Sequence, residues 1–280
     1  MKEKKYLFNL IFWITLSILF NIFIYITRGE TCAVEYFGGY IVEMSLSLDN
    51  LFLFLMIFSS FGIKEDYQER VLLFGVLGAM VLRLIFILLG VSIVNKFHSV
   101  LSLFGIILLY SGFKMIFKKE EHIEFHDNFA VKCLRKIMPV TTVLHENKFF
   151  VKKNKIIYAT PLLAVLVVIE FSDVLFAIDS IPAIFSITTD TFIVYTSNIF
   201  AILGLRSMYY ILEKMNNTFK FMKYGVGVIL MFTGVKLFIL LFGIEISVTN
   251  SVLIIMIILL ASILLSLLFG GIDKRRYPQR

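Results

Sequence analysis

Eight long apolar segments divide this sequence of 280 residues, and each can supply the ~20 residues that a helix needs to cross a lipid bilayer. They cover residues 6–27, 37–61, 70–94, 99–117, 156–187, 190–212, 221–243 and 249–270. Hydrophobic residues make up 59% of the chain, which is too many for a soluble domain of this length. The sequence therefore predicts an all-α polytopic membrane protein surrounded by a lipid bilayer.

Basic residues are distributed unevenly between the two sides of this predicted membrane protein. If the N-terminus lies in the cytoplasm, the cytoplasmic parts carry 21 Lys and Arg residues, whereas the extracytoplasmic loops carry two, Arg28 and Lys96. Because short cytoplasmic loops are enriched in Lys and Arg, we expect both termini in the cytoplasm. The net charge of +7 is thus explained by topology and does not indicate nucleic-acid binding.

The sequence contains no signature of catalysis. Cys32 and Cys133 are the two cysteines, and in this topology they lie on opposite sides of the membrane and cannot form a disulfide bond. No HExxH, GxSxG, P-loop or GxGxxG motif is present. We therefore expect no enzyme and no resident cofactor, and any transport must be driven by an ion gradient or by a partner.

An acidic motif occurs twice inside the apolar segments. Glu43 and Asp49-Asn50 share one frame with Asp173 and Asp179-Ser180: an acid, five residues, a second acid and a small polar residue. A carboxylate in hydrocarbon costs at least ~2.5–3.5 kcal/mol, so four of them in two copies of one pattern indicate a function, with a cation pathway as the default interpretation.

The duplication extends beyond the acids. Arg83 corresponds to Arg206, and the segment Gly105-Ile-Ile-Leu-Leu-Tyr-Ser-Gly-Phe-Lys114 corresponds to Gly227-Val-Ile-Leu-Met-Phe-Thr-Gly-Val-Lys236. Each copy holds three helices, and because three is odd the second copy enters the membrane from the opposite side. Inverted repeats of this kind are typical of secondary transporters. The predicted organisation is an N-terminal transmembrane helix (1–28), a first repeat (37–117), a cytoplasmic charged loop (118–155), a second repeat (156–243) and a C-terminal transmembrane helix with a basic tail (249–280).

All candidate cation ligands of the motif carry oxygen, which suits Mg²⁺, Ca²⁺ or Mn²⁺ and argues against Zn²⁺ or Cu⁺. The predicted metal-binding residues are Glu43, Asp49, Asn50, Asp173, Asp179 and Ser180. Arg83 and Arg206 would neutralise the empty site; alternatively, they form structural ion pairs with the acids. Possible accessory residues are Glu170, which extends the site or pairs with Arg206, and Asn198, which is a neutral ligand or packs in the interior.

Convergence of the two acids of one copy needs a particular backbone. Glu43 and Asp49 are about 120° apart around a straight helix, so they converge if the helix is broken or if they reach the site from different depths. Pro182 removes a backbone N–H and frees the carbonyl of Ile178, which is a further candidate ligand.

Outside the motif, we expect Lys114 and Lys236 to lie at the membrane interface. The charged loop contains His122 and His126, and most loops of this composition are simply solvated.

The two acidic segments resemble the TerC/Alx family of bacterial integral membrane proteins. The first match runs Glu-Met-Ser-Leu-Ser-Leu-Asp-Asn-Leu-Phe from Glu43, and the second runs Glu-Phe-Ser-Asp-Val-Leu-Phe-Ala-Ile-Asp-Ser-Ile-Pro-Ala-Ile-Phe from Glu170. The resemblance implies a multi-pass protein of the bacterial inner membrane that exports a divalent cation, with Mn²⁺ as the leading candidate, through the six predicted ligands. In Alx-like members, the resemblance implies an additional N-terminal helix before the segment that starts here.

The same resemblance leaves a second function open. The family is named for tellurium resistance, and members have been linked to membrane-protein insertion, so the alternative is a membrane-stress or assembly factor that transports nothing. A transporter needs the acids to converge at one midplane site, whereas an assembly factor tolerates them in separate ion pairs. The sequence gives neither the metal, the coupling ion nor the oligomeric state.

Overall fold

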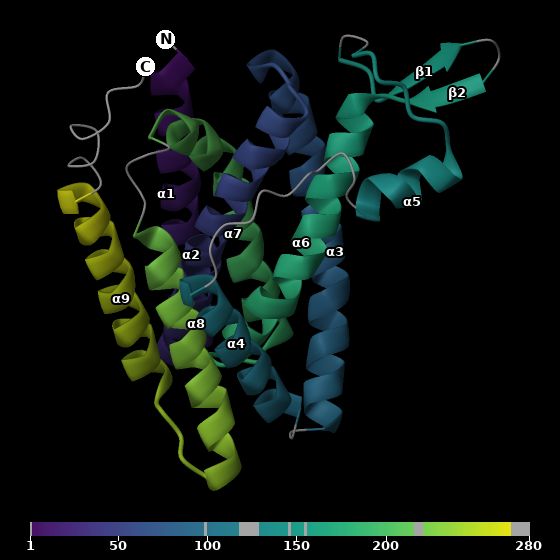
Figure 1. Cartoon of the computed structure of the whole chain (residues 1–280). Coiled ribbons are helices and arrows are strands. Elements are labelled where there is room, and N and C mark those ends of the chain that lie inside the picture. The colour runs from purple at the N-terminus through teal and green to yellow at the C-terminus, as the bar shows by residue number, and fades with distance from the viewer. Residues whose placement is uncertain are drawn as a thin grey trace. The chain divides into compact units, whose positions relative to one another are not determined.

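The computed structural model describes residues 2–97, 100–117, 129–144, 147–153, 156–215 and 221–269, and these are almost entirely helical, which confirms the all-α prediction. Within the helices, a few side chains also lie outside the described part of the structure, and that of Asp49 is one of them. Figure 1 labels the α-helices and the β-strands in chain order, and the elements of the described part are as follows. They are α1 (Lys2–Arg28), α2 (Glu30–Ser60), α3 (Glu65–Lys96), α4 (Val100–Phe117), α5 (Phe129–Ile137), β1 (Phe150–Lys153), β2 (Ile156–Ala159), α6 (Pro161–Phe185), α7 (Thr191–Met215), α8 (Met222–Ile239), the 3₁₀ turn η2 (Leu240–Phe242) and α9 (Val248–Phe269).

Seven of the described helices are long and apolar enough to cross a membrane: α1, α3, α4, α6, α7, α8 and α9. The eighth predicted segment, 37–61, forms α2, which is 31 residues long but is not one of the seven. Large apolar side chains are exposed along these helices, for example Phe8 on α1, Leu77 on α3 and Ile257 on α9. Apolar faces of this kind are stable only in hydrocarbon, so the helices form a multi-pass membrane protein.

The connection between α1 and α2 is shorter than the sequence suggests. α1 ends at Arg28 and α2 begins at Glu30, so the predicted helix start at residue 37 was late. Gly29 alone makes the turn, with φ +90°, a left-handed conformation that glycine adopts without steric cost. The first turns of α2 then pack against α1: the hydroxyls of Ser17 and Tyr36 lie 2.9 Å apart, and Tyr36 is fully buried.

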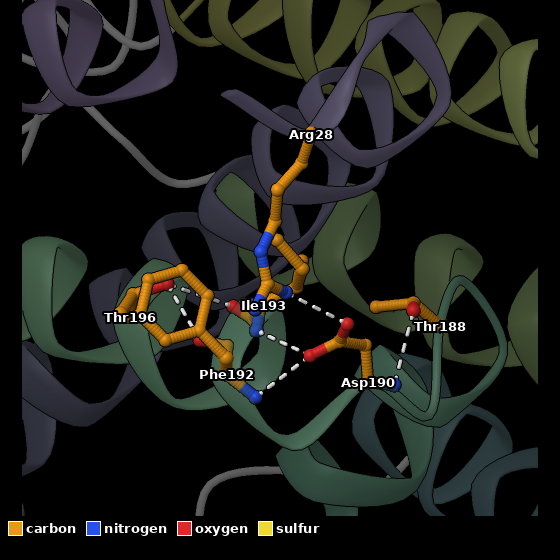
Figure 2. A network of polar contacts seen from close by, with 6 residues as sticks. All are labelled: Arg28, Thr188, Asp190, Phe192, Ile193 and Thr196. Atoms are coloured by element: carbon orange, nitrogen blue, oxygen red, sulfur yellow. Dashed lines mark hydrogen bonds and ion pairs between the residues drawn. The ribbon is translucent and has the colours of Figure 1, made fainter. Parts of the chain in front are cut away.

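An ion pair joins the end of α1 to the start of α7 (Figure 2). Arg28 Nη1 donates to Asp190 Oδ2 at 3.0 Å, and its guanidinium lies 4.5 Å from the centre of the Phe192 ring. Asp190 Oδ1 accepts the backbone N–H groups of Phe192 at 2.8 Å and Ile193 at 3.2 Å. Asp190 is therefore the N-cap of α7, and Arg28 holds the cap in place.

Helices α4 and α8 pack so closely that only glycine fits between them. A Cβ on Gly105 would lie 2.8 Å from the Gly234 carbonyl oxygen, and a Cβ on Gly234 would lie 2.8 Å from that of Gly105. A Cβ on Gly112 would lie 2.6 Å from the Gly227 oxygen, and one on Gly227 would lie 3.1 Å from that of Gly112. The helices therefore run antiparallel with their backbones in contact, as small residues permit in membranes.

The chain forms two compact units, each with its own core. The first unit comprises Met1–Asp49, Arg83–Lys118 and Ala177–Arg280. Its main core is built from apolar side chains of α2, α3, α4, α6, α7, α8 and α9, including Val42, Ile87 and Leu108.

The second unit comprises Asn50–Leu82 and Lys119–Phe176. The sequence predicts only a charged loop over 118–155, but within the described part of it the chain forms α5 and β1, and β1 pairs antiparallel with β2 from Phe150↔Ala159 to Lys153↔Ile156. Arg70 of α3 anchors this region: it donates to the Asn147 carbonyl oxygen, and its guanidinium lies 5.0 Å from the centre of the Phe149 ring. The two histidines of the loop lie outside the described residues.

Candidate functional site

Glu43 lies at the centre of a closed polar network in the first unit. Arg83 Nη1 donates to Glu43 Oε1 and also to Asn198 Oδ1, the latter at 2.7 Å. Asn198 Nδ2 donates to Glu43 Oε2 at 3.2 Å, and Ser47 Oγ donates to Glu43 Oε1 at 3.2 Å. Three helices, α2, α3 and α7, thus contribute to one cluster, which we term the Glu43 network.

The Glu43 network is buried from solvent. The exposed fraction is 0% for Glu43, 1% for Arg83 and 0% for Asn198. A buried carboxylate is tolerable only when it is paired and hydrogen-bonded, and both oxygens of Glu43 have donors here. The Asn198 amide contacts both charges, oxygen toward the arginine and nitrogen toward the carboxylate, so its two ends are fixed by the pair.

Asp179 contacts a different helix. It lies half-buried on α6, where Ser111 Oγ of α4 donates to its Oδ1 at 2.7 Å. Lys114 lies one turn further along α4 and is exposed. Sequence reasoning did not single out Ser111, because a serine in an apolar helix is common and carries no charge.

Ser180, the neighbour of Asp179, has a hydroxyl without a partner. Its exposed fraction is 2%, and its Oγ makes no hydrogen bond to any described residue. The hydroxyls of several other buried serines in the described helices bond back to a carbonyl three or four residues earlier, as Ser172 does with Val168 at 2.8 Å. A buried hydroxyl that lacks such a bond is available to a ligand.

The helices that carry the acids are continuous. α2 runs without a break from Glu30 to Ser60, and α6 runs from Pro161 to Phe185 with Pro182 inside it. The alternative in which a broken helix brings Glu43 and Asp49 together therefore does not apply to this structure. Pro182 still lacks an N–H, so the Ile178 carbonyl lacks its usual helical donor.

The second unit holds three of the predicted residues. Asn50 of α2 and Asp173 of α6 are both buried. Glu170 packs against the backbone of α3: a Cβ on Gly78 would lie 2.1 Å from Glu170 Oε1. The Glu170 Oε2 atom makes no hydrogen bond to a described residue.

The predicted ligands are thus distributed over both units. Glu43, Asp179 and Ser180 belong to the first unit, and Asn50 and Asp173 belong to the second. In the part of the chain that the structure describes, no three His, Cys, Asp or Glu side chains are grouped closely enough to hold a metal ion. Arg206 is half-buried on α7, two turns after Asn198.

Burial also distinguishes the two matched lysines. Lys114 is exposed, as the sequence predicts for an interfacial lysine. Lys236 has an exposed fraction of 5%, so the same prediction was wrong for this residue. Its side chain lies inside the first unit, because α8 packs against both α4 and α9.

Comparison with known proteins assigns the chain to a family. The model of the "Integral membrane protein TerC family" matches residues 28–276. The "Putative membrane-bound redox modulator Alx" of Salmonella typhi is 47% identical over 237 residues, which are 82% of this chain and 74% of that protein. The protein of the same name from Escherichia coli K12 is 46% identical over 235 residues, which are 81% and 73% of the two chains.

A plant protein also matches. The "Thylakoid membrane protein TERC, chloroplastic" of Arabidopsis thaliana is 43% identical over 251 residues, which are 90% of this chain and 65% of that protein. No solved structure shows a significant match.

Proposed function

The chain belongs to the TerC family of integral membrane proteins, and from this premise we propose that it exports a divalent cation, with Mn²⁺ as the cargo, across a bacterial inner membrane. The cation passes through a midplane site to which both repeats contribute. Arg83 and Arg206 balance the acidic charge while the site is empty. The proposed ligands are Glu43, Asp49, Asn50, Asp173, Asp179 and Ser180.

The observation that carries this proposal is the unpartnered hydroxyl of Ser180 beside Asp179. Leaving a buried hydroxyl unsatisfied costs free energy, and a cargo ion that binds the oxygen would remove this cost. Serine and aspartate oxygens are hard ligands that suit Mn²⁺. The Ile178 carbonyl, which lacks a helical donor because of Pro182, is a third oxygen on the same segment of α6.

The glycine contacts between α4 and α8 support the inverted repeat on which this proposal depends. The sequence repeat equates Gly105 with Gly227 and Gly112 with Gly234. In the structure Gly105 contacts Gly234, and Gly112 contacts Gly227. Replacing each glycine by its counterpart in the other repeat therefore turns the contact of Gly105 with Gly234 into the contact of Gly227 with Gly112. Such reciprocal contacts are typical of a self-complementary interface about a two-fold axis.

A second candidate function, a membrane-stress or assembly factor without transport activity, is favoured by the Glu43 network. Both carboxylate oxygens of Glu43 already accept hydrogen bonds, from Arg83, Asn198 and Ser47. Glu43 and Arg83 thus form a separate ion pair of the kind that an assembly factor tolerates. The two functions differ in what happens to the carboxylate. A transporter must release Glu43 from Arg83 when the cargo binds, whereas an assembly factor keeps the pair closed.

Transport in proteoliposomes tests the proposal. The purified protein is reconstituted with a Mn²⁺-sensitive dye inside the vesicles, and a proton gradient is applied. We expect Mn²⁺ flux that Asp179→Asn abolishes. We expect Ser180→Ala to raise the KM for Mn²⁺ by about 2- to 12-fold, which corresponds to one hydrogen-bond-sized contact.

Stability provides the control for the serine substitution. Ser180→Ala removes an unsatisfied hydroxyl, so its Tm should not fall. Ser92→Ala is the matched control, because Ser92 is exposed on α3 and its hydroxyl bonds to its own helix at Leu88. If the wild-type protein moves no Mn²⁺, or if Ser180→Ala and Ser92→Ala transport alike, the proposed site is wrong.

A further inference from the structure

The inner face of helix α5 is fixed to the second unit. Its buried residues are Ala130, Val131 and Leu134. Leu134 packs in one apolar cluster with Ala159, the last residue of β2, and with Ala164 in the first turn of α6. The chain that follows α5 is tied to β2, because the Thr141 N–H donates to the Ala159 carbonyl and the Ala159 N–H donates to the Pro139 carbonyl, each at 2.9 Å. The helix is therefore held in one place beside α6 (Figure 1).

The outward side of α5 carries two kinds of residue in separate sectors. Its basic residues fall within about 100° of one another around the helix axis, and they are Lys132, Arg135 and Lys136. Phe129 and Ile137 are 65% and 80% exposed, and they fall about 80° apart, beside the basic sector. A helix with adjoining apolar and basic sectors is typical of the boundary between lipid headgroups and acyl chains.

The position of Phe129 along α6 places α5 at this boundary. The centre of its ring lies 5.8 Å from that of Phe171, which comes ten residues after Pro161, the start of α6. Ten residues of helix span about 15 Å, whereas the 25 residues of α6 exceed a hydrocarbon core of about 30 Å by only about 7 Å. Phe171 therefore lies within the hydrocarbon, with Phe129 beside it. Because Leu134 lies at the level of Ala164, α5 runs from this depth toward the headgroups.

Charge on and around α5 is of one sign. The described residues between 129 and 159 include no Asp or Glu, and their basic residues are Lys132, Arg135, Lys136, Lys148, Lys152 and Lys153. Arg135 and Lys136 are exposed, and they form no salt bridge with a residue that the structure describes. The phosphate groups of anionic lipids are complementary to such a surface, and they are abundant in cytoplasmic leaflets.

We propose that α5 is an interfacial helix that binds the headgroups of anionic phospholipids. Arg135 and Lys136 contact the lipid phosphates, and Phe129 inserts between the upper parts of the acyl chains. The helix thereby anchors the second unit to the membrane surface, whereas the sequence predicts a solvated loop at this place. This inference is independent of cation export, because none of its residues is a proposed metal ligand.

Lipid binding is tested by thermal unfolding of the full-length protein in an uncharged detergent, with phosphatidylglycerol or phosphatidylcholine added as the probe. Phosphatidylglycerol should raise the Tm by about 4–8 °C relative to phosphatidylcholine, because a ligand of the folded state stabilises it. The Arg135→Gln, Lys136→Gln variant should need about 10- to 30-fold more phosphatidylglycerol for the half-maximal shift, since each base near an anionic surface strengthens binding about fivefold. Without added lipid this variant should unfold at the wild-type Tm, because both side chains are exposed.

The matched control is Lys152→Gln, Lys153→Gln, which removes the same charge from β1 and should keep the wild-type affinity for phosphatidylglycerol. Phe129→Ser should weaken this affinity by about 3- to 10-fold, because it removes the inserted apolar side chain. Inorganic phosphate at the same concentration should leave the Tm unchanged, and a rise equal to that with lipid would overturn the assignment to lipid.

Three further results would contradict the proposal. Equal Tm values in the two lipids would exclude anionic lipid and favour an acidic protein segment as the partner of α5. Equal losses of affinity in the two double variants would show a general effect of net charge. An unchanged affinity in Phe129→Ser would exclude insertion of the helix.

Discussion

Residues of opposite charge stabilise one another in the Glu43 network. Neither charge could be buried alone, since an isolated ion in a low-dielectric interior carries a large desolvation penalty. Arg83 offers several N–H groups in a fixed plane, and its Nη1 nitrogen, which carries two of them, donates to both Glu43 and Asn198. The neutral amide then returns a hydrogen bond to the carboxylate. Stability at this site therefore depends on the whole set and not on a single pair.

Removing one charge of this network should be worse than removing both. Arg83→Met leaves Glu43 buried and unpaired, and we expect it to destabilise the fold by about 3–5 kcal/mol. The double variant Arg83→Met with Glu43→Gln should recover most of that loss. Thermal unfolding in detergent measures both, with Arg135→Met at an exposed position of α5 as the control. A double variant as unstable as the sum of its parts would show that charge compensation is not the dominant effect.

The sequence predicts the charged residues of the site better than its neutral ones. Glu43 and Arg83 stand out because charge in an apolar segment is costly and therefore informative. Asn198 was predicted only as an accessory residue and Ser111 was not singled out, since amides and hydroxyls occur in membrane helices for many reasons. Which acid meets which arginine depends on helix rotation, and each residue turns a helix by 100°. A sequence alone does not fix that rotation.

Gly29 separates the helices α1 and α2, whereas Pro182 does not interrupt the helix α6. Gly29 permits a one-residue turn, and the sequence did not reveal it because the residues after it are polar enough to resemble a loop. Pro182 was expected to free the carbonyl of Ile178, and α6 continues through it as one helix. Neighbouring helices compensate for a lost hydrogen bond in a membrane protein, so proline is tolerated there.

The close packing of α4 against α8 predicts that a larger residue at Gly112 destabilises the protein. The Cβ of Gly112→Ala would lie 2.6 Å from the Gly227 oxygen and 2.9 Å from the Met231 nitrogen, and backbone atoms cannot rotate away. We expect a loss of about 1–3 kcal/mol in the free energy of unfolding. Gly204→Ala is the control, because its Cβ would lie 3.7 Å from Leu10 Cδ1, an ordinary contact. Equal stability of the two variants would mean that the helices separate easily.

Glu35, at the start of α2, predicts that the stability of the protein depends on pH. It precedes the predicted apolar segment 37–61. Burial raises the pKa of Glu35 above its ordinary value, and the charge of Asp190 raises this pKa further, while a hydrogen bond from Thr188 lowers it. The folded protein thus holds the proton more tightly than the unfolded chain. The stabilisation that comes from this proton on Glu35 is fully present below the unfolded pKa of about 4.3, and it is lost as the pH rises through the folded pKa.

Glu35→Gln should therefore be more stable than the wild type at neutral pH and equal to it at pH 4. Because Glu35 is half-buried and solvent screens its charge, the gain in Tm should not exceed about 2–4 °C. Unfolding curves from pH 4 to pH 8 measure the gap. A gap that is constant over this range would exclude ionisation of Glu35 as its cause.

The whole molecule shows what composition can and cannot predict. The abundance of apolar residues and the length of the apolar segments predict a multi-pass membrane protein, and seven described helices confirm it. The division into two compact units was not predictable, because three of its four boundaries fall inside α2, α3 and α6 rather than in loops. The hairpin β1–β2 was missed for a related reason: its four-residue strands are too short to show a period of two above the surrounding charge.

Topology is the last property that the sequence predicts for the whole molecule, and the two native cysteines can test it. The charge asymmetry of 21 basic residues against two places Cys32 outside and Cys133 in the cytoplasm. Both are free thiols with intermediate exposure. In intact cells a membrane-impermeant maleimide should label the Cys133→Ser variant, which retains Cys32, and should not label Cys32→Ser. In inverted membrane vesicles the pattern should reverse, and the Cys32→Ser, Cys133→Ser double variant should remain unlabelled in both. Labelling of both single variants from the same side would mean that the chain crosses the bilayer in an order that the charge distribution does not predict.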